Sequence, residues 1–117
     1  MMLLAKNYNN YLIKLIKSHI NSSDVIVDFG AGLGNFAESL SGNGHKVVCI
    51  EADDEFRENL KKRGFACFKT LDELDDDSVD LLYSLNVLDH IENDYEIIEK
   101  IYSKIKVGRN FDLCASF

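Results

Sequence analysis

The stretch from residue 27 to residue 37, VDFGAGLGNFA, limits what this chain can fold into more than any other. The apolar run at residues 25–29 predicts a short buried strand, and the apolar spacing from Asn35 to Leu40 predicts a helix. Three glycines lie between these two elements, at positions 30, 32 and 34. A strand, a glycine loop and a helix in this order are typical of a nucleotide-type cofactor site.

Glycine in such a loop lets the backbone turn sharply and lets a ligand approach without meeting a Cβ. The helix that follows points free N–H groups into the loop. A strand-to-helix turn without any ligand is the competing interpretation, because isolated glycine motifs give false positives. The residues that follow are therefore needed to distinguish a cofactor loop from a turn that binds no ligand.

A carboxylate follows at the expected place. Residues 46–51, KVVCIE, predict a second buried strand that ends in Glu51. In doubly wound sheets an acidic side chain at this strand tip accepts hydrogen bonds from ribose hydroxyls. Asp53 is the competing candidate, but the acidic residues after it suit the first turn of a helix that Asp53 caps. The pattern favours Glu51 as the ribose ligand.

Two cofactor classes use this arrangement. The nicotinamide dinucleotide fingerprint, Gly-x-Gly-x-x-Gly, needs a glycine at position 35, where this chain has Asn35. Asp28 would repel a pyrophosphate in the loop, whereas a cationic ligand would be attracted to it. A nicotinamide-binding domain stays open as the alternative.

At these residues the chain resembles a known family. Residues 27–34, VDFGAGLG, look like the first motif of class I S-adenosylmethionine-dependent methyltransferases, and Glu51 matches the second. Residues 78–91, SVDLLYSLNVLDHI, are similar to the fourth-strand signature of the type 11 and type 12 methyltransferase-domain families, with Asp89 replacing a glutamate. The resemblance runs from about residue 24 to the C-terminus. It implies an α/β fold: a Rossmann-like three-layer α/β/α sandwich with a mostly parallel sheet of order 3-2-1-4-5.

The resemblance also implies a set of cofactor-binding residues for S-adenosyl-L-methionine. The amino-acid end would be held by Asp28 and the backbone of Gly30, Ala31, Gly32 and Gly34. The ribose would be held by Glu51, the adenine faces by Ala52 and Leu71, and the methionine by the backbone of Asn86 and Val87. The apolar members of this set, Ala52, Leu71 and Val87, fit an ordinary core equally well.

His90 is the candidate catalytic residue, because it is the side chain near the expected transfer site that suits proton transfer at neutral pH. A supporting role is the alternative for this histidine. The sulfonium is a strong electrophile, so transfer mainly needs the acceptor to be placed in line with the methyl group.

Length is the second informative feature, because 117 residues are few for a doubly wound fold. Residues 1–117 are expected to form a single methyltransferase domain that lacks the usual last two strands, the N-terminal portion of the full fold. Catalytic activity of so short a chain is an open point. A non-catalytic binding or assembly module is therefore a further alternative.

The elements expected along the chain alternate strictly. Helices are predicted at residues 5–20, 56–63 and from 95 to about 106, the second closed by Gly64 and the third by Gly108, with strands at 65–69, 79–84 and 110–117. A capping box at residues 93–96 starts the third helix. The fifth strand would be an open edge, so self-association is expected near Phe111, Leu113, Ala115 and Phe117.

Charge and cysteine content narrow the functional classes. The net charge is −7, which makes a general nucleic-acid surface improbable. The basic residues 61–63 fit a helix C-terminus, and the acidic residues between 72 and 80 fit a solvated loop better than a metal site.

Cys49, Cys67 and Cys114 fall in predicted strands and indicate core positions in a reducing compartment. No signal peptide or membrane-spanning run is present, so a cytoplasmic protein is expected.

Overall fold

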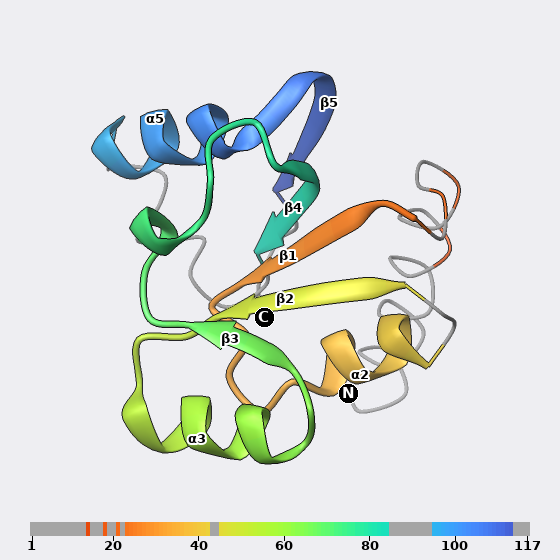
Figure 1. The fold of residues 1–117 in the computed structure, drawn as a ribbon, viewed down its shortest axis with the longest axis vertical. Helices are drawn as coiled ribbons and strands as arrows, with labels where there is room; N and C mark the ends of the chain where they lie inside the picture. The colour runs from red at the N-terminus through yellow and green to blue at the C-terminus, as the bar shows by residue number, and fades with distance from the viewer. Residues whose placement is uncertain are drawn as a thin grey trace, which may run out of the picture.

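Five parallel strands form one sheet in the computed structural model, which describes residues 14, 18, 21, 23–42, 45–84 and 95–113, the last five by backbone alone. Their order is β3-β2-β1-β4-β5, which confirms the predicted topology (Figure 1). The strands are β1 (Val25–Phe29), β2 (Lys46–Ile50), β3 (Ala66–Phe68), β4 (Val79–Ser84) and β5 (Ile105–Leu113).

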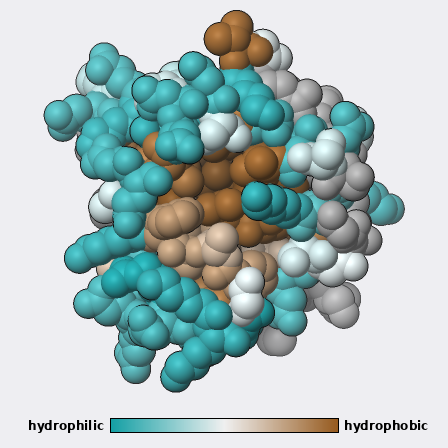
Figure 2. All heavy atoms as spheres, in the orientation of Figure 1, coloured by the Kyte–Doolittle hydropathy of each residue, from teal (hydrophilic) through white to brown (hydrophobic). Residues whose placement is uncertain are grey.

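Helices cover both faces of this sheet. They are α2 (Asn35–Ser41), α3 (Asp54–Lys62), the 3-10 helix η1 (Leu71–Glu73) and α5 (Tyr95–Lys104). Alternate residues of a strand point to opposite faces, so Ile26 packs with the buried residues of α2 and α3, whereas Val27 packs with Ile101 of α5. The three-layer sandwich is therefore confirmed. Figure 2 shows apolar side chains gathered on the sheet face between α3 and α5, framed by hydrophilic ones.

Two cysteines lie side by side in the sheet. Cys49 of β2 is in register with Cys67 of β3, and both thiols are free and buried. Burial raises the pKa of Cys49 to about 12, and it also raises the pKa of Cys67. The interpretation of these two residues as core positions is confirmed; Cys114 lies outside the described residues.

The last strand corrects one prediction. β5 begins at Ile105, directly after α5, and not at Asn110. Gly108 therefore does not terminate the helix; it has a φ of 84° inside the strand. Val79 pairs with Ile105 but Leu81 pairs with Asn110, so the strand bulges between them. The bulge carries Lys106, whose ammonium lies 3.1 Å from the carboxylate of Asp80. This ion pair and the pairing with β4 hold residues 105 and 106 in the sheet, where the end of the third helix was predicted.

Asp80 is a second correction. The acidic residues 72, 73 and 75–77 are exposed, as the predicted solvated loop requires, but Asp80 is buried within β4. Its carboxylate accepts a hydrogen bond from the Val25 N–H at 2.8 Å. The predicted first helix and capping box lie outside the described residues, apart from Lys14, Ser18 and Tyr95–Glu96. The side chains of the predicted self-association residues also lie outside them, so that prediction stays untested.

Candidate functional site

The glycine loop connects β1 to α2 at the carboxyl end of the sheet. Gly30, Gly32 and Gly34 all have positive φ, at 79°, 58° and 76°. The Gly30 N–H donates to the Ile50 carbonyl at 2.8 Å, which fixes the loop against β2. A Cβ on Gly34 would lie 2.5 Å from Leu60 of α3. The positive φ therefore favours glycine at position 34, and any side chain there would also have to displace the buried Leu60.

Glu51 connects the glycine loop to the segment after β2. One carboxylate oxygen accepts from the Gly32 N–H at 2.8 Å, and the other accepts from the Asp53 N–H at 2.9 Å. The Asp53 carboxylate accepts instead from the N–H groups of Glu55 and Phe56, both at 3.0 Å. Asp53 is therefore the N-cap of α3, as predicted, and Glu51 is the acid that faces the loop.

Asp28 lies beneath the loop with 3% of its surface exposed. The Tyr83 hydroxyl donates to its carboxylate at 2.9 Å. Burial raises the pKa of Asp28 to about 7; the hydrogen bond from Tyr83 opposes the rise, and the negative charge of Glu51 adds to it. A cation bound at this loop would lower that pKa and stabilise the ionised carboxylate.

Two arginines of the α3 segment contact the site, a role that the sequence pattern predicted for neither. Arg57 donates to the carbonyls of Glu51 and Ala52. Arg63 donates to the carbonyl of Leu33 in the glycine loop. Lys61 and Lys62 do lie in the last turn of α3, as predicted for cations at a helix C-terminus. No sequence signal distinguishes Arg63 from these two neighbours, because its partners are distant in the chain.

The other predicted site residues divide into two groups. Ala31 is buried in the loop, Ala52 is exposed, and Leu71 is buried in the core cluster on the α5 side of the sheet. Asn86, Val87 and His90 lie outside the described residues. Just before them, Ser84 at the end of β4 is fully buried, and its hydroxyl has no hydrogen-bond partner among the residues that the structure describes. Within the described ranges, no group of three metal-ligating side chains converges.

Residues 27–110 match the family model of the methyltransferase domain. The chain belongs to this methyltransferase-domain family. The match includes the glycine loop, Glu51 and all five strands except the start of β1 and the end of β5. The family resemblance and the predicted fold class are thus confirmed together.

Known proteins with similar sequences include the ubiquinone biosynthesis O-methyltransferases of Rickettsia bellii and Rickettsia typhi. The R. bellii protein is 32% identical over an alignment that covers 83% of this methyltransferase domain and 45% of the relative. The R. typhi protein is 30% identical over 82% of the chain and 43% of the relative. The chain therefore spans less than half the length of these curated relatives.

Solved structures share the fold. A SAM-dependent methyltransferase from Archaeoglobus fulgidus has a TM-score of 0.73 and 19% identity, covering 91% of this chain and 50% of that one. One from Aquifex aeolicus has a TM-score of 0.69 and 18% identity, covering 86% and 61%. In the part of this methyltransferase domain that the structure describes, no helix is long and apolar enough to cross a membrane.

Proposed function

We propose that this chain binds S-adenosyl-L-methionine and is the cofactor-binding part of a methyltransferase. The observation that carries the proposal is the carboxylate of Glu51 at the tip of β2, hydrogen-bonded to the Gly32 N–H. A carboxylate has about four lone-pair sites, and the two backbone N–H groups occupy only two of them. Counting the donors among the described residues, two acceptor positions are left for the hydroxyls of a ribose.

The charges around the loop favour a cationic cofactor. S-adenosylmethionine carries a sulfonium and an ammonium against one carboxylate, and both acids of the site, Asp28 and Glu51, are negative when ionised. Burial raises the pKa of Asp28 and the charge of Glu51 adds to the rise, so a bound cation would stabilise the ionised carboxylate. A dinucleotide would bring a diphosphate toward these acids, which is unfavourable. The family match supports the same choice over the nicotinamide alternative.

The residues present fit this cofactor at three points. The Gly30–Gly34 backbone leaves space for close approach of the amino-acid end, and the Glu51 carboxylate would accept from the ribose hydroxyls. The Ser84 hydroxyl, which has no partner among the described residues, provides a buried polar group at the end of β4. The bound cofactor supplies an electrophilic methyl group. The chain's own residues bind and orient it, and that positioning is the main requirement for transfer. His90 as a general base stays a prediction.

The methyl acceptor is left open in this proposal. The Rickettsia relatives are O-methyltransferases by name, but they are more than twice as long as the region aligned. The proposal is therefore confined to the cofactor and to the group transferred. We propose a cytoplasmic location as well, since the buried thiols of Cys49 and Cys67 are both free.

Calorimetric titration of the chain with S-adenosylhomocysteine tests the proposal without an acceptor. Glu51→Ala should weaken binding by at least tenfold, since it removes a charge-assisted ribose contact of about 1.5–3 kcal/mol. Glu58→Ala is the matched control, because Glu58 is an exposed acid on α3. Binding of NAD with no binding of S-adenosylhomocysteine would overturn the proposal, and so would equal affinities of wild type and Glu51→Ala.

A further inference from the structure

Helix α3 holds both loops of the cofactor site through two arginine side chains. Arg57 in the helix contacts the segment after β2, and Arg63 at its C-cap contacts the glycine loop. We propose that Arg57 and Arg63 are positioning residues, which fix the two loops at the spacing that the cofactor needs without touching it. The inference rests on the proposed function, because it names residues that prepare the same site.

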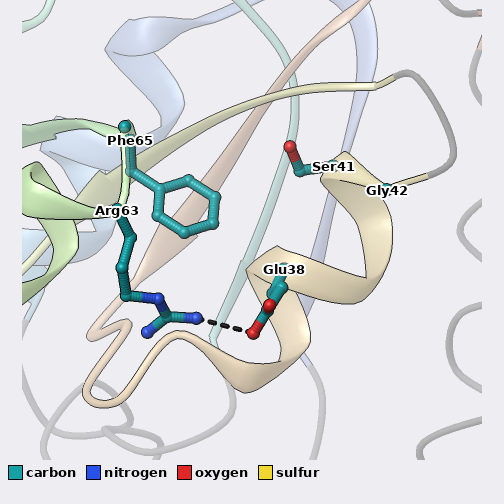
Figure 3. A pocket seen from close by; sticks show the side chains of 6 residues that line it. Glu38, Ser41, Gly42, Arg63 and Phe65 are labelled. Carbon is teal, nitrogen blue, oxygen red and sulfur yellow. Dashed lines mark hydrogen bonds and ion pairs between the residues drawn. The ribbon is translucent and has the colours of Figure 1, made fainter.

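Several partners hold Arg63 in one orientation, and Figure 3 shows two of them, Glu38 and Phe65. One guanidinium nitrogen donates to the Leu33 carbonyl, and the other donates to the Glu38 carboxylate of α2 at 2.7 Å. The guanidinium also lies over the Phe65 ring, 5.6 Å from its centroid. The side chain is 29% exposed, so most of it is packed. These contacts join the C-terminus of α3, the glycine loop and α2 into one unit.

Arg57 holds the segment after β2 in a similar way. Its Nη1 donates to the carbonyls of Glu51 and Ala52, at 3.0 and 3.2 Å, and its Nη2 is paired with Asp54. Only 15% of the side chain is exposed. The Glu51 residue is therefore held at its backbone by Arg57 while its carboxylate reaches Gly32.

The contacts form a closed circuit. Arg63 of the α3 segment donates to the glycine loop, and the Gly32 N–H of that loop donates to the Glu51 carboxylate. Arg57 of α3 in turn donates to the Glu51 carbonyl, so the chain of hydrogen bonds begins and ends at α3. The planar fork of arginine can donate to two acceptors at once, which a lysine ammonium on a flexible stem does with less geometric constraint. Both arginines use that fork to contact a backbone carbonyl and a carboxylate together.

The first test is the affinity of the variants for S-adenosylhomocysteine. Arg63→Ala and Arg57→Ala should each bind about tenfold more weakly, equivalent to 1.4 kcal/mol. Lys62→Ala is the matched control, since it removes a cation from the same end of α3 and Lys62 is exposed. Arg63→Lys should bind between wild type and Arg63→Ala. Ethylguanidinium at millimolar concentration should restore part of the affinity of Arg63→Ala, because a pocket lined by Glu38, Ser41, Phe65 and their neighbours opens beside Arg63.

The second test needs no cofactor. Hydrogen exchange of the Gly32 amide reports its bond to Glu51, and it should be about tenfold faster in either arginine variant than in wild type, a loss equivalent to 1.4 kcal/mol of protection. The exchange of core amides in β1 and β4 should be unchanged, which distinguishes a loosened loop from general destabilisation. Arg→Lys variants provide the same comparison if an alanine variant does not fold.

The outcomes separate this inference from the proposed function. If wild type does not bind S-adenosylhomocysteine, the proposed function fails, and the exchange of Gly32 still decides whether the arginines hold the loop. If wild type binds and the arginine variants match it in both affinity and exchange, the positioning role is overturned. Loss of affinity that ethylguanidinium and lysine both fail to restore, with core amides exchanging faster, would also overturn it in favour of a general packing role.

Discussion

Two buried aspartates at opposite ends of this sheet have different surroundings. Asp80, near the amino end of β4, is 5% exposed and is paired with the Lys106 ammonium at 3.1 Å. Asp28, near the carboxyl end of β1, is 3% exposed and receives a hydroxyl hydrogen bond from Tyr83. Among the side chains that the structure describes, no lysine or arginine forms an ion pair with Asp28.

The difference shows for which of the two acids the described residues offset the cost of burying a negative charge. Removing a carboxylate from water is costly unless a cation or hydrogen bonds compensate. Asp80 has its cation and a backbone N–H, so its role is structural. Asp28 has instead a second acid, Glu51, whose charge raises its pKa further. The missing positive charge is what the proposed cationic cofactor would supply.

The largest effect should be a pH dependence of stability that Asp28→Asn removes. The folded pKa of Asp28 is about 7 and the reference value is 3.8. A raised carboxyl pKa means that the folded state retains a proton that the unfolded state has lost between these values. Stability from this group is thus complete below pH 3.8, falls as pH rises, and has been lost above about 7.

The fall should amount to about 4 kcal/mol, at 1.36 kcal/mol for each pKa unit. Urea unfolding of wild type and Asp28→Asn from pH 4 to pH 8 measures it. The free energy of unfolding of wild type should decline relative to the variant across this range and then level off. Parallel profiles for the two proteins would show that Asp28 is already compensated, and the contrast with Asp80 would disappear.

A smaller loss should follow Asp80→Ala. The substitution removes the acceptor of the Val25 N–H and the partner of Lys106. Because the Lys106 side chain is 47% exposed and can be solvated, we expect about 2 kcal/mol less stability, below the usual cost of breaking a buried pair. Urea unfolding at pH 7 measures the change. Asp75→Ala, an exposed acid nearby, should change stability by less than about 0.5 kcal/mol; equal losses in both variants would remove the structural role of Asp80.

The smallest effect should come from Tyr83→Phe. Loss of the hydroxyl donor should raise the pKa of Asp28 above 7, because that hydrogen bond lowers it in wild type. Stability above pH 7 should fall by about 1 kcal/mol, the usual value of one hydrogen bond. NMR titration of the Asp28 carboxyl measures the shift directly. A pKa that stays the same or falls in Tyr83→Phe would mean that Tyr83 does not stabilise the ionised acid.

Local patterns were sufficient to predict much of this molecule. The bounds of β4 at Val79–Ser84, the glycine loop, and the N-cap role of Asp53 follow from apolar runs and from residue types at fixed offsets. The acidic tip of β2 at Glu51 follows from spacing in the same way. These features depend on residues close together in the chain.

Contacts between distant residues could not be predicted in this way. Arg63 is 30 residues from Leu33, and Lys106 is 26 residues from Asp80. A helix-end cation and a strand-start lysine look like ordinary surface residues until the fold brings their partners together. The error at Gly108 has a different origin, because a glycine with positive φ suits a helix stop or a strand bulge equally well and only the pairing with β4 decides between them.

The neighbouring thiols of Cys49 and Cys67 can report local opening of this part of the sheet. Buried thiols with raised pKa values react slowly with alkylating reagents, because the thiolate is the reactive form. Cys49 is fully buried, so its labelling requires β2 to open, whereas Cys67 on the edge strand β3 keeps 8% of its surface exposed. The labelling rate of Cys49 therefore measures how often β2 separates from its neighbours. Mass spectrometry of the peptides that carry these two cysteines would time that opening at each residue, and a ligand that binds Glu51 at the end of β2 should slow both rates.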